Sequence, residues 1–148
     1  MVFKRSISIV LLLLGFIKAE IVVCQSLSGL TIIANNIGTK SLKEMQVIDA
    51  FKAKNNLWSN GKSILVSLPP TASSDASEVA NRIYGKSVSE VQKFWLALVF
   101  QGRGRPPQFV ESDQEMIDYI SRTPGAIGAF VNEKGLPIPA ELLLHISQ

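Results

Sequence analysis

A serine-rich segment, Pro69–Ser77, holds the side chains of this chain that are best suited to binding a small anion. An apolar run precedes it and a helical pattern follows, so the exposed amides of a helix start are expected beside the hydroxyls of Ser73, Ser74 and Ser77. Simple capping of the helix is the competing interpretation and the commoner one. Asp75 favours capping, because its carboxylate would occupy the positive end of the helix dipole and repel an incoming anion.

Two arginines on a loop rich in glycine and proline form the second candidate. In Gln101–Pro107, Arg103 and Arg105 each follow a glycine, and two guanidinium groups can hold an anion with a fork of N–H donors. The competing interpretation is a solvated loop with mobile charges. The candidate anion-binding residues are therefore Ser73, Ser74, Asp75, Ala76, Ser77, Arg103 and Arg105.

The chain lacks the residues that nucleophilic catalysis or a metal centre would need. It has one histidine, His145, and one cysteine, Cys24, which excludes a multi-histidine or cysteine-rich metal site. No Gly-x-Ser-x-Gly motif occurs, and the acidic residues fall at helix starts and on polar faces rather than in a catalytic pair. We expect no catalytic residue, no metal, no cofactor and no enzymatic activity.

Two Gly-Lys-Ser segments imitate a nucleotide-binding loop but fail its spacing. The motif needs a second glycine five residues before Gly61 or Gly85, and those positions hold Asn56 and Ala80. We interpret Gly61 as the turn glycine before a strand and Gly85 as the end of a helix.

The N-terminal segment is typical of a secretory signal peptide. Lys4 and Arg5 precede the apolar run Ile7–Ile17, which is shorter than the ~20 residues of a transmembrane span. Cleavage is expected after Ala19 or Cys24. An uncleaved anchor is the alternative, and lipid attachment at Cys24 is disfavoured by the bulky valines before it. We expect a signal peptide over 1–24, a single domain over 27–148, and a periplasmic or secreted protein without a stable membrane span.

The basic character of the chain belongs to this targeting segment. Cleavage after Ala19 would remove Lys4, Arg5 and Lys18, which lowers Lys+Arg from 15 to 12 and makes it equal to the 12 Asp+Glu. A mature chain of zero net charge gives no support to nucleic-acid binding.

The remaining sequence alternates strand-like and helix-like segments around one core. With 47% hydrophobic and 18% charged residues, the chain can bury a core and is not disordered as a whole. Short apolar runs predict strands at Leu30–Ala34, Ile64–Leu68, Phe109–Val110 and Ala126–Val131. We expect an α/β fold with a central mixed, partly parallel sheet flanked by helices. Leu142–Ile146 is either a last edge strand or a short helix, and the absence of a cap favours the strand.

Four helix starts share one signature, a short oxygen-bearing residue followed three positions later by glutamate. The cap residue can accept from the first-turn amides, and the glutamate can reach back to the cap amide. The four predicted caps are Ser41, Asp75, Ser87 and Ser112.

The order of these pieces resembles the phosphate-type substrate-binding proteins of ABC transporters, in the type 2 periplasmic binding protein superfamily. The specific parts are the helix Leu42–Phe51 followed by Trp58–Gly61, and the sequence Thr-Pro-Gly-Ala-Ile-Gly at Thr123–Gly128. The match runs over Leu30–Val131. It corresponds to one lobe of a fold in which two lobes enclose the ligand.

The resemblance implies a transport-related binding module whose anion site is altered. The family's Ser-Gly-Thr-Ser turn at a helix start matches Ser74–Ser77, where Asp75 and Ala76 replace the glycine and threonine. The family's nearby arginine segment reads Leu68–Pro70. We expect weak or partner-assisted binding of phosphate or another small oxyanion. The alternative is an envelope scaffold or interaction protein, docking an envelope protein or a second copy, that keeps the lobe fold without a ligand.

Overall fold

The computed structural model describes residues 26–148, and the predicted signal peptide and Cys24 lie outside them. The elements follow in the order β1 (Thr31–Ala34), β2 (Ser41–Lys43), α1 (Glu44–Phe51), β3 (Leu65–Leu68), α2 (Ser74–Val79), the π-helical turn η1 (Ala80–Tyr84), α3 (Val88–Phe100), β4 (Gln108–Phe109), α4 (Asp113–Arg122), β5 (Ala126–Phe130) and β6 (His145–Ser147). Within this part of the chain, no helix combines the length and apolar character that a bilayer crossing requires.

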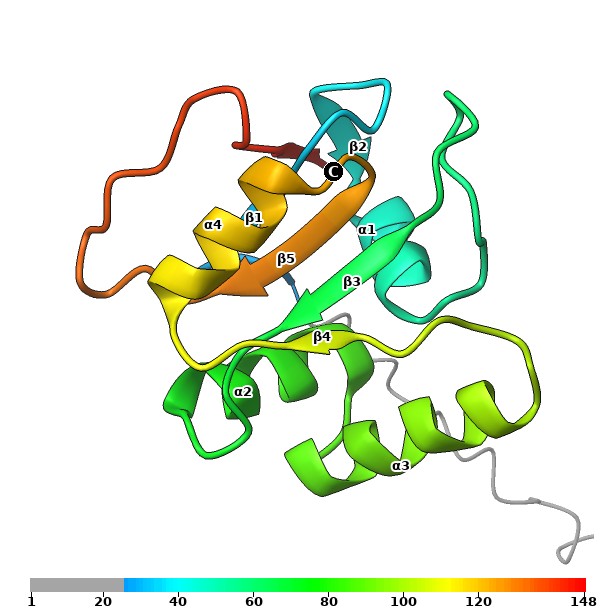
Figure 1. Cartoon of the computed structure of the whole chain (residues 1–148). Coiled ribbons are helices and arrows are strands. Elements are labelled where there is room, and N and C mark those ends of the chain that lie inside the picture. Colours follow the sequence, from blue (N-terminus) through cyan, green and yellow to red (C-terminus); the bar gives the residue numbers. More distant parts are fainter. Residues whose placement is uncertain (1–25) are drawn as a thin grey trace, which may run out of the picture.

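The central sheet has four strands in the order β1-β5-β3-β4 (Figure 1). Strand β3 runs parallel to both of its neighbours, with Val66 opposite Ile127 and Ser67 opposite Gln108, whereas β1 runs antiparallel to β5. A second, two-stranded parallel sheet joins β2 to β6. The predicted α/β class with a mixed, partly parallel sheet is therefore confirmed.

Helices cover both faces of the central sheet, and β5 is therefore buried along its whole length, with apolar side chains on both sides. Ile127 and Ala129 face the larger core, which also contains buried residues of α1, α2, η1 and α3. Ala126 and Phe130 face the smaller core beneath α4. Gly128 leaves room for α4, since a Cβ there would lie 2.7 Å from Met116 Sδ.

Two of the four predicted helix caps are confirmed. The Ser87 hydroxyl accepts from the Glu90 amide, and the Glu90 carboxylate accepts from the Ser87 amide in return. The Ser112 hydroxyl accepts from the Glu115 amide in the same way, although the Glu115 carboxylate reaches the amide of Glu111 rather than that of Ser112.

The other two predicted caps are wrong. Residues 41–43 form β2 instead of a helix start, because Leu42 pairs with Ile146 of β6, and α1 begins only at Glu44. Helix α2 is capped by Ser73, whose hydroxyl accepts from the Ala76 amide, and Asp75 lies inside the helix. The tail is extended as expected, with Leu143 bridging to Ile33 of β1 before β6 begins.

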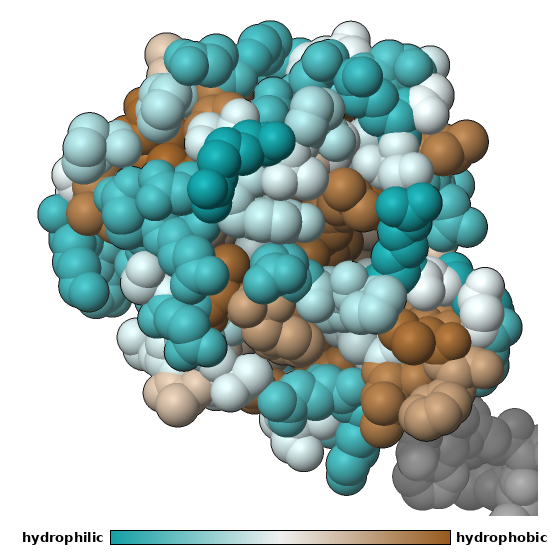
Figure 2. All heavy atoms as spheres, in the orientation of Figure 1, coloured by the Kyte–Doolittle hydropathy of each residue, from teal (hydrophilic) through white to brown (hydrophobic). Residues whose placement is uncertain are grey.

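The outer face of α3 carries an exposed apolar stripe made of Leu96, Val99 and Phe100. The exposed fraction of Phe100 is 83%. Figure 2 shows brown, apolar residues gathered in this region of the molecule.

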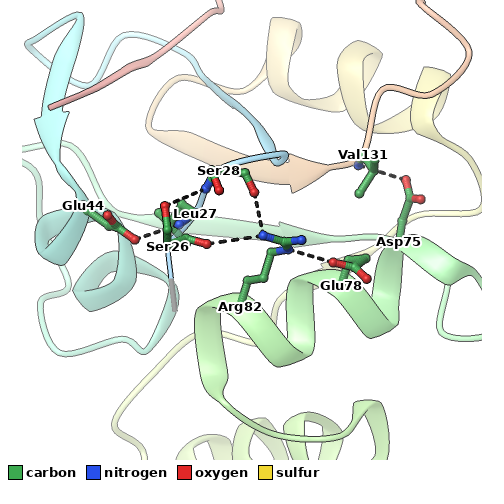
Figure 3. Close-up of polar contacts among 8 residues, drawn as sticks. All are labelled: Ser26, Leu27, Ser28, Glu44, Asp75, Glu78, Arg82 and Val131. Carbon is green, nitrogen blue, oxygen red and sulfur yellow. Dashed lines mark hydrogen bonds and ion pairs between the residues drawn. The ribbon is translucent and has the colours of Figure 1, made fainter. Parts of the chain in front are cut away.

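Polar contacts tie the start of the described chain to the helical layer (Figure 3). The Arg82 guanidinium donates to the Ser28 carbonyl oxygen at 2.6 Å and pairs with Glu78 at 2.7 Å. The Leu27 amide donates to the Glu44 carboxylate at 2.7 Å. The Glu44 carboxylate therefore binds the segment that precedes β1 and does not cap its own helix.

Tyr84 supplies the main polar connection inside the larger core. Its hydroxyl donates to the Phe51 carbonyl oxygen at 2.9 Å and accepts from Trp95 Nε1 at 3.1 Å. Burial raises the pKa of Tyr84, and the hydrogen bond from Trp95 offsets this in part. The hydroxyl is neutral at physiological pH and joins α1, η1 and α3.

Replacing Tyr84 with phenylalanine is expected to lower the free energy of unfolding by about 2 kcal/mol, because a buried donor and a buried acceptor each lose a partner. Urea unfolding followed by tryptophan fluorescence would measure the loss. Tyr119→Phe is the matched control, since Tyr119 is only partly buried and its hydroxyl has no hydrogen bond within residues 26–148. Equal effects of the two substitutions would contradict the prediction.

Candidate functional site

The crossover connections create a crevice at the carboxyl ends of β3 and β4. The chain leaves β3 for α2 on one face of the sheet and leaves β4 for α4 on the other face. Two adjacent parallel strands whose helices lie on opposite faces leave a gap between the two helix starts, which is where open α/β sheets bind ligands. A hollow of about 400 Å³, the switch-point hollow, lies there, lined by Pro70, Ala72, Ser73, Ser74, Asp75, Glu111, Ser112, Asp113, Val131, Glu133 and Lys134.

The structure divides the serines of the predicted anion site. Ser73 and Ser74 line the switch-point hollow, but the Ser73 hydroxyl is already used, since it donates to the Pro70 carbonyl oxygen at 2.7 Å and accepts from an amide. The Ser74 hydroxyl has no partner within residues 26–148 and remains available for a ligand. Ala76 is buried against apolar neighbours, and Ser77 lines a different hollow with Lys86.

Asp75 is 8% exposed, and its carboxylate accepts from the Val131 amide at 3.1 Å (Figure 3). This contact joins the start of α2 to the end of β5 across the hollow. The carboxylate therefore has a structural role that sequence reasoning did not foresee. It caps a strand end rather than the amides of its own helix.

The amides that open both helices are left free around the hollow. Within residues 26–148, the amides of Ser74 and Asp75 in α2 and that of Asp113 in α4 donate to no acceptor. Helix-start amides carry partial positive charge and can bind an anion. Two helix starts thus present donors to the same space.

Acidic side chains line the same hollow, and their negative charge works against anion binding by these donors. Asp75, Glu111, Asp113 and Glu133 line the hollow, and Lys134 is the only basic residue among its lining residues. Partial burial raises the pKa of Asp113, the negative charge of Asp75 raises it further, and Lys134 lowers it in part. The carboxylates can accept hydrogen bonds from a group that carries a proton, and their negative charge repels an anion that carries none.

Three of the lining residues that matter here were not selected from the sequence as ligand contacts. Ser112 was predicted only as a helix cap, and Asp113 and Lys134 were not singled out. The pattern that could have found Ser112 and Asp113 is a helix start directly after a predicted strand, because such starts gather at one edge of a parallel sheet.

Arg103 and Arg105 lie elsewhere. They line a separate hollow with Asn56, Ser63 and Trp95, next to the residues that lead into β3 and β4. Because the switch-point hollow lies at the opposite, carboxyl end of these strands, the arginines and Ser74 do not form one site.

No group of three or more histidine, cysteine, aspartate or glutamate side chains within residues 26–148 could hold a metal ion. The arrangement around the switch point supplies hydrogen-bond donors, a free hydroxyl and carboxylates. These groups suit reversible binding of a small polar ligand.

The comparisons with known proteins bear on the fold. PstS from Borrelia burgdorferi has a TM-score of 0.56 and 18% sequence identity, over 81% of this chain and 47% of that one. An ABC-type phosphate transport receptor from Vibrio cholerae has a TM-score of 0.49 and 14% identity, over 80% of this chain and 46% of that one. No family model matches the sequence, and no curated protein does.

The likeness to the Borrelia protein establishes the fold. The predicted resemblance to phosphate-type substrate-binding proteins is confirmed at this level, including its restriction to one part of their fold. The chain spans less than half the length of either protein.

Proposed function

We propose that this chain is a solute-binding module that binds a small oxyanion such as phosphate, weakly or with the help of a partner, in the switch-point hollow. The single observation that carries the proposal is the convergence of two helix starts with free amides on a hollow at the carboxyl ends of β3 and β4. Ser74 adds a free hydroxyl at the same place. The likeness of the fold to a phosphate-binding protein agrees with this ligand class.

The expected affinity is low for two physical reasons. A hollow presented by one lobe leaves much of the ligand in water, so the donors act in a high dielectric. The carboxylates of Asp75 and Asp113 also repel a dianion. Both costs would fall if a partner closed the hollow from outside.

A protonated oxyanion suits this lining best. Carboxylate oxygens only accept hydrogen bonds, so an anion with a P–O–H group can donate to them. Sulfate is fully deprotonated at neutral pH and has no proton to offer. We propose phosphate over sulfate on this ground.

The role is a transport-related one in the periplasm or outside the cell, and not catalysis. This part of the proposal depends on the sequence of the first 24 residues, which is typical of a signal peptide. The likeness to a transport binding protein is in keeping with it.

Replacing Ser74 with alanine is expected to weaken phosphate binding about fivefold, because one direct hydrogen bond to a charged ligand is lost. Amide chemical shifts followed during titration of the purified protein with phosphate would give the dissociation constant. Ser77→Ala is the matched control, since Ser77 is in the same helix but lines another hollow.

The proposal fails if no amide around the hollow shifts with phosphate, sulfate or molybdate. If none of the three oxyanions changes the amide chemical shifts and light scattering shows a stable dimer, the alternative of an interaction protein is favoured. The exposed stripe of Leu96, Val99 and Phe100 is the observation that favours that alternative.

A further inference from the structure

A second hollow, of about 270 Å³, lies beside the start of β3 where α1, α3 and the loop after α3 meet. Its floor is apolar and includes Val66 and Trp95, and its polar side chains include Asn55, Arg103 and Arg105. Among the residues that line it, none is acidic. The hollow therefore offers both an apolar surface and positive charge to a ligand.

The two arginines have no partner in the part of the chain that the structure describes. The ion pairs found there are those of Lys54 with Asp49 and of Arg82 with Glu78, and neither Arg103 nor Arg105 makes a hydrogen bond through its guanidinium. A free guanidinium keeps five donors in a planar fork that matches a carboxylate or a phosphate group.

Backbone hydrogen bonds and packing fix the loop at residues 102–104, next to both arginines. The Gly102 amide donates to the Val99 carbonyl oxygen and the Arg103 amide to that of Leu98, each at 3.0 Å. Gly104 packs on the floor, since a Cβ there would lie 3.5 Å from Trp95 Cζ3. These contacts reduce the conformational entropy that the backbone at Arg103 would lose when a ligand binds.

We propose that this hollow is a second binding site, independent of the switch-point hollow, for a small organic anion. The ligand class is a carboxylate or phosphate monoester attached to a flat apolar body. Arg103 and Arg105 hold the charged group at the rim, and the apolar body rests on the floor near Trp95. A competing role for the arginines is to offset the negative end of the α3 dipole, which would require no ligand.

Phenyl phosphate is the probe for this site, with inorganic phosphate as the comparison. Titration of the full chain, followed by tryptophan fluorescence, is expected to report binding through Trp95. The double variant Arg103→Gln, Arg105→Gln should lose about tenfold or more in affinity for phenyl phosphate, because the charge-assisted contacts disappear. Arg103→Lys keeps the charge without the planar fork and should lose part of this affinity.

Two controls separate this site from the switch-point hollow and from general charge effects. Arg122→Gln removes an arginine on α4 that is outside the lining of this hollow, and it should bind phenyl phosphate as the unchanged protein does. Ser74→Ala should also leave phenyl phosphate binding unchanged.

Unchanged affinity in the double variant would overturn the proposal, and so would an affinity for inorganic phosphate equal to that for phenyl phosphate. Affinity lost in Ser74→Ala but kept in the arginine variants would assign the probe to the switch-point hollow, which contradicts this inference and supports the proposed function. Both arginines are exposed, so unfolding midpoints of the variants should match that of the unchanged protein.

Discussion

Replacing Gly125 with alanine is expected to lower the free energy of unfolding by roughly 3–5 kcal/mol, a large share of the stability of a small domain. Gly125 has φ +89°, and a Cβ on it would lie 2.3 Å from the Ser63 carbonyl oxygen. Backbone at that distance must move. The displaced segment leads into β3, so the damage extends to the central sheet.

The same glycine is a meeting point for hydrogen bonds that the displacement would break. Its carbonyl oxygen accepts from Trp58 Nε1 at 2.8 Å and from the Leu65 amide at 3.2 Å. Its amide donates to the Asn35 carbonyl oxygen at 2.7 Å. Each bond lost with a buried partner costs about 1 kcal/mol or more.

Gly61→Ala separates steric clash from backbone strain. Gly61 also has a positive φ, +79°, but a Cβ there would meet no atom within 4 Å. Its replacement should cost about 1 kcal/mol, the penalty of the backbone conformation alone. Urea midpoints from tryptophan fluorescence would compare the two variants, and equal losses would show that the contact with Ser63 carries no cost.

The second large effect is expected from Asp75→Asn, which should raise the affinity for oxyanions in the switch-point hollow by about tenfold or more, because a buried negative charge is removed beside the ligand. The side-chain oxygen of the introduced asparagine can still accept from the Val131 amide, so the fold is retained. Sulfate should gain more than phosphate, since phosphate loses an acceptor for its proton. Chemical-shift titrations with both anions would measure the two changes.

Protonation of Asp113 should act in the same direction as this substitution. The pKa of Asp113 is raised by burial and by the charge of Asp75, so Asp113 becomes neutral at a higher pH than an exposed aspartate does. Below that pKa it can donate to an anion, and above it the negative charge repels one. Affinity should therefore rise as the pH falls.

Sulfate is the suitable probe for this pH dependence, because it does not change its own charge near neutral pH. Asp113→Asn should abolish the rise in sulfate affinity at low pH. If neither Asp75→Asn nor a lower pH improves sulfate binding, the carboxylates are not beside the anion and the assigned position of the site is wrong.

The sequence predicted strands and helix caps correctly where each depends on contacts between residues close together in the chain. The strands over 31–34, 65–68 and 126–130 follow from short apolar runs, and the caps at Ser87 and Ser112 follow from a serine and a glutamate within one helical turn. Gly85 ends η1 in the left-handed conformation, as its place between two helical patterns indicated. These features depend on residues only a few positions apart.

The predicted helix caps were wrong where a segment distant in the sequence binds the same residues. Residues 41–43 have a helix-start pattern, but the C-terminal segment reaches them and pairs as β6. Asp75 is a residue type that often caps helices, but the Val131 amide lies close enough to donate a hydrogen bond to its carboxylate. A pattern within four residues carries no information about partners 56 or 105 positions away.

The sequence by itself predicted the α/β class, because apolar spacing is a local property, and the order of its motifs showed the resemblance to a phosphate-type binding lobe. It also supplied candidate residues for contacting an anion. Only the tertiary structure decided how those residues are grouped. It placed Ser74 and Asp113 around one hollow at the carboxyl ends of β3 and β4, and the two arginines with Trp95 around another hollow near the opposite ends of these strands. The direction of parallel strands and the face taken by each crossover helix set that division, and both depend on packing between segments far apart in the chain.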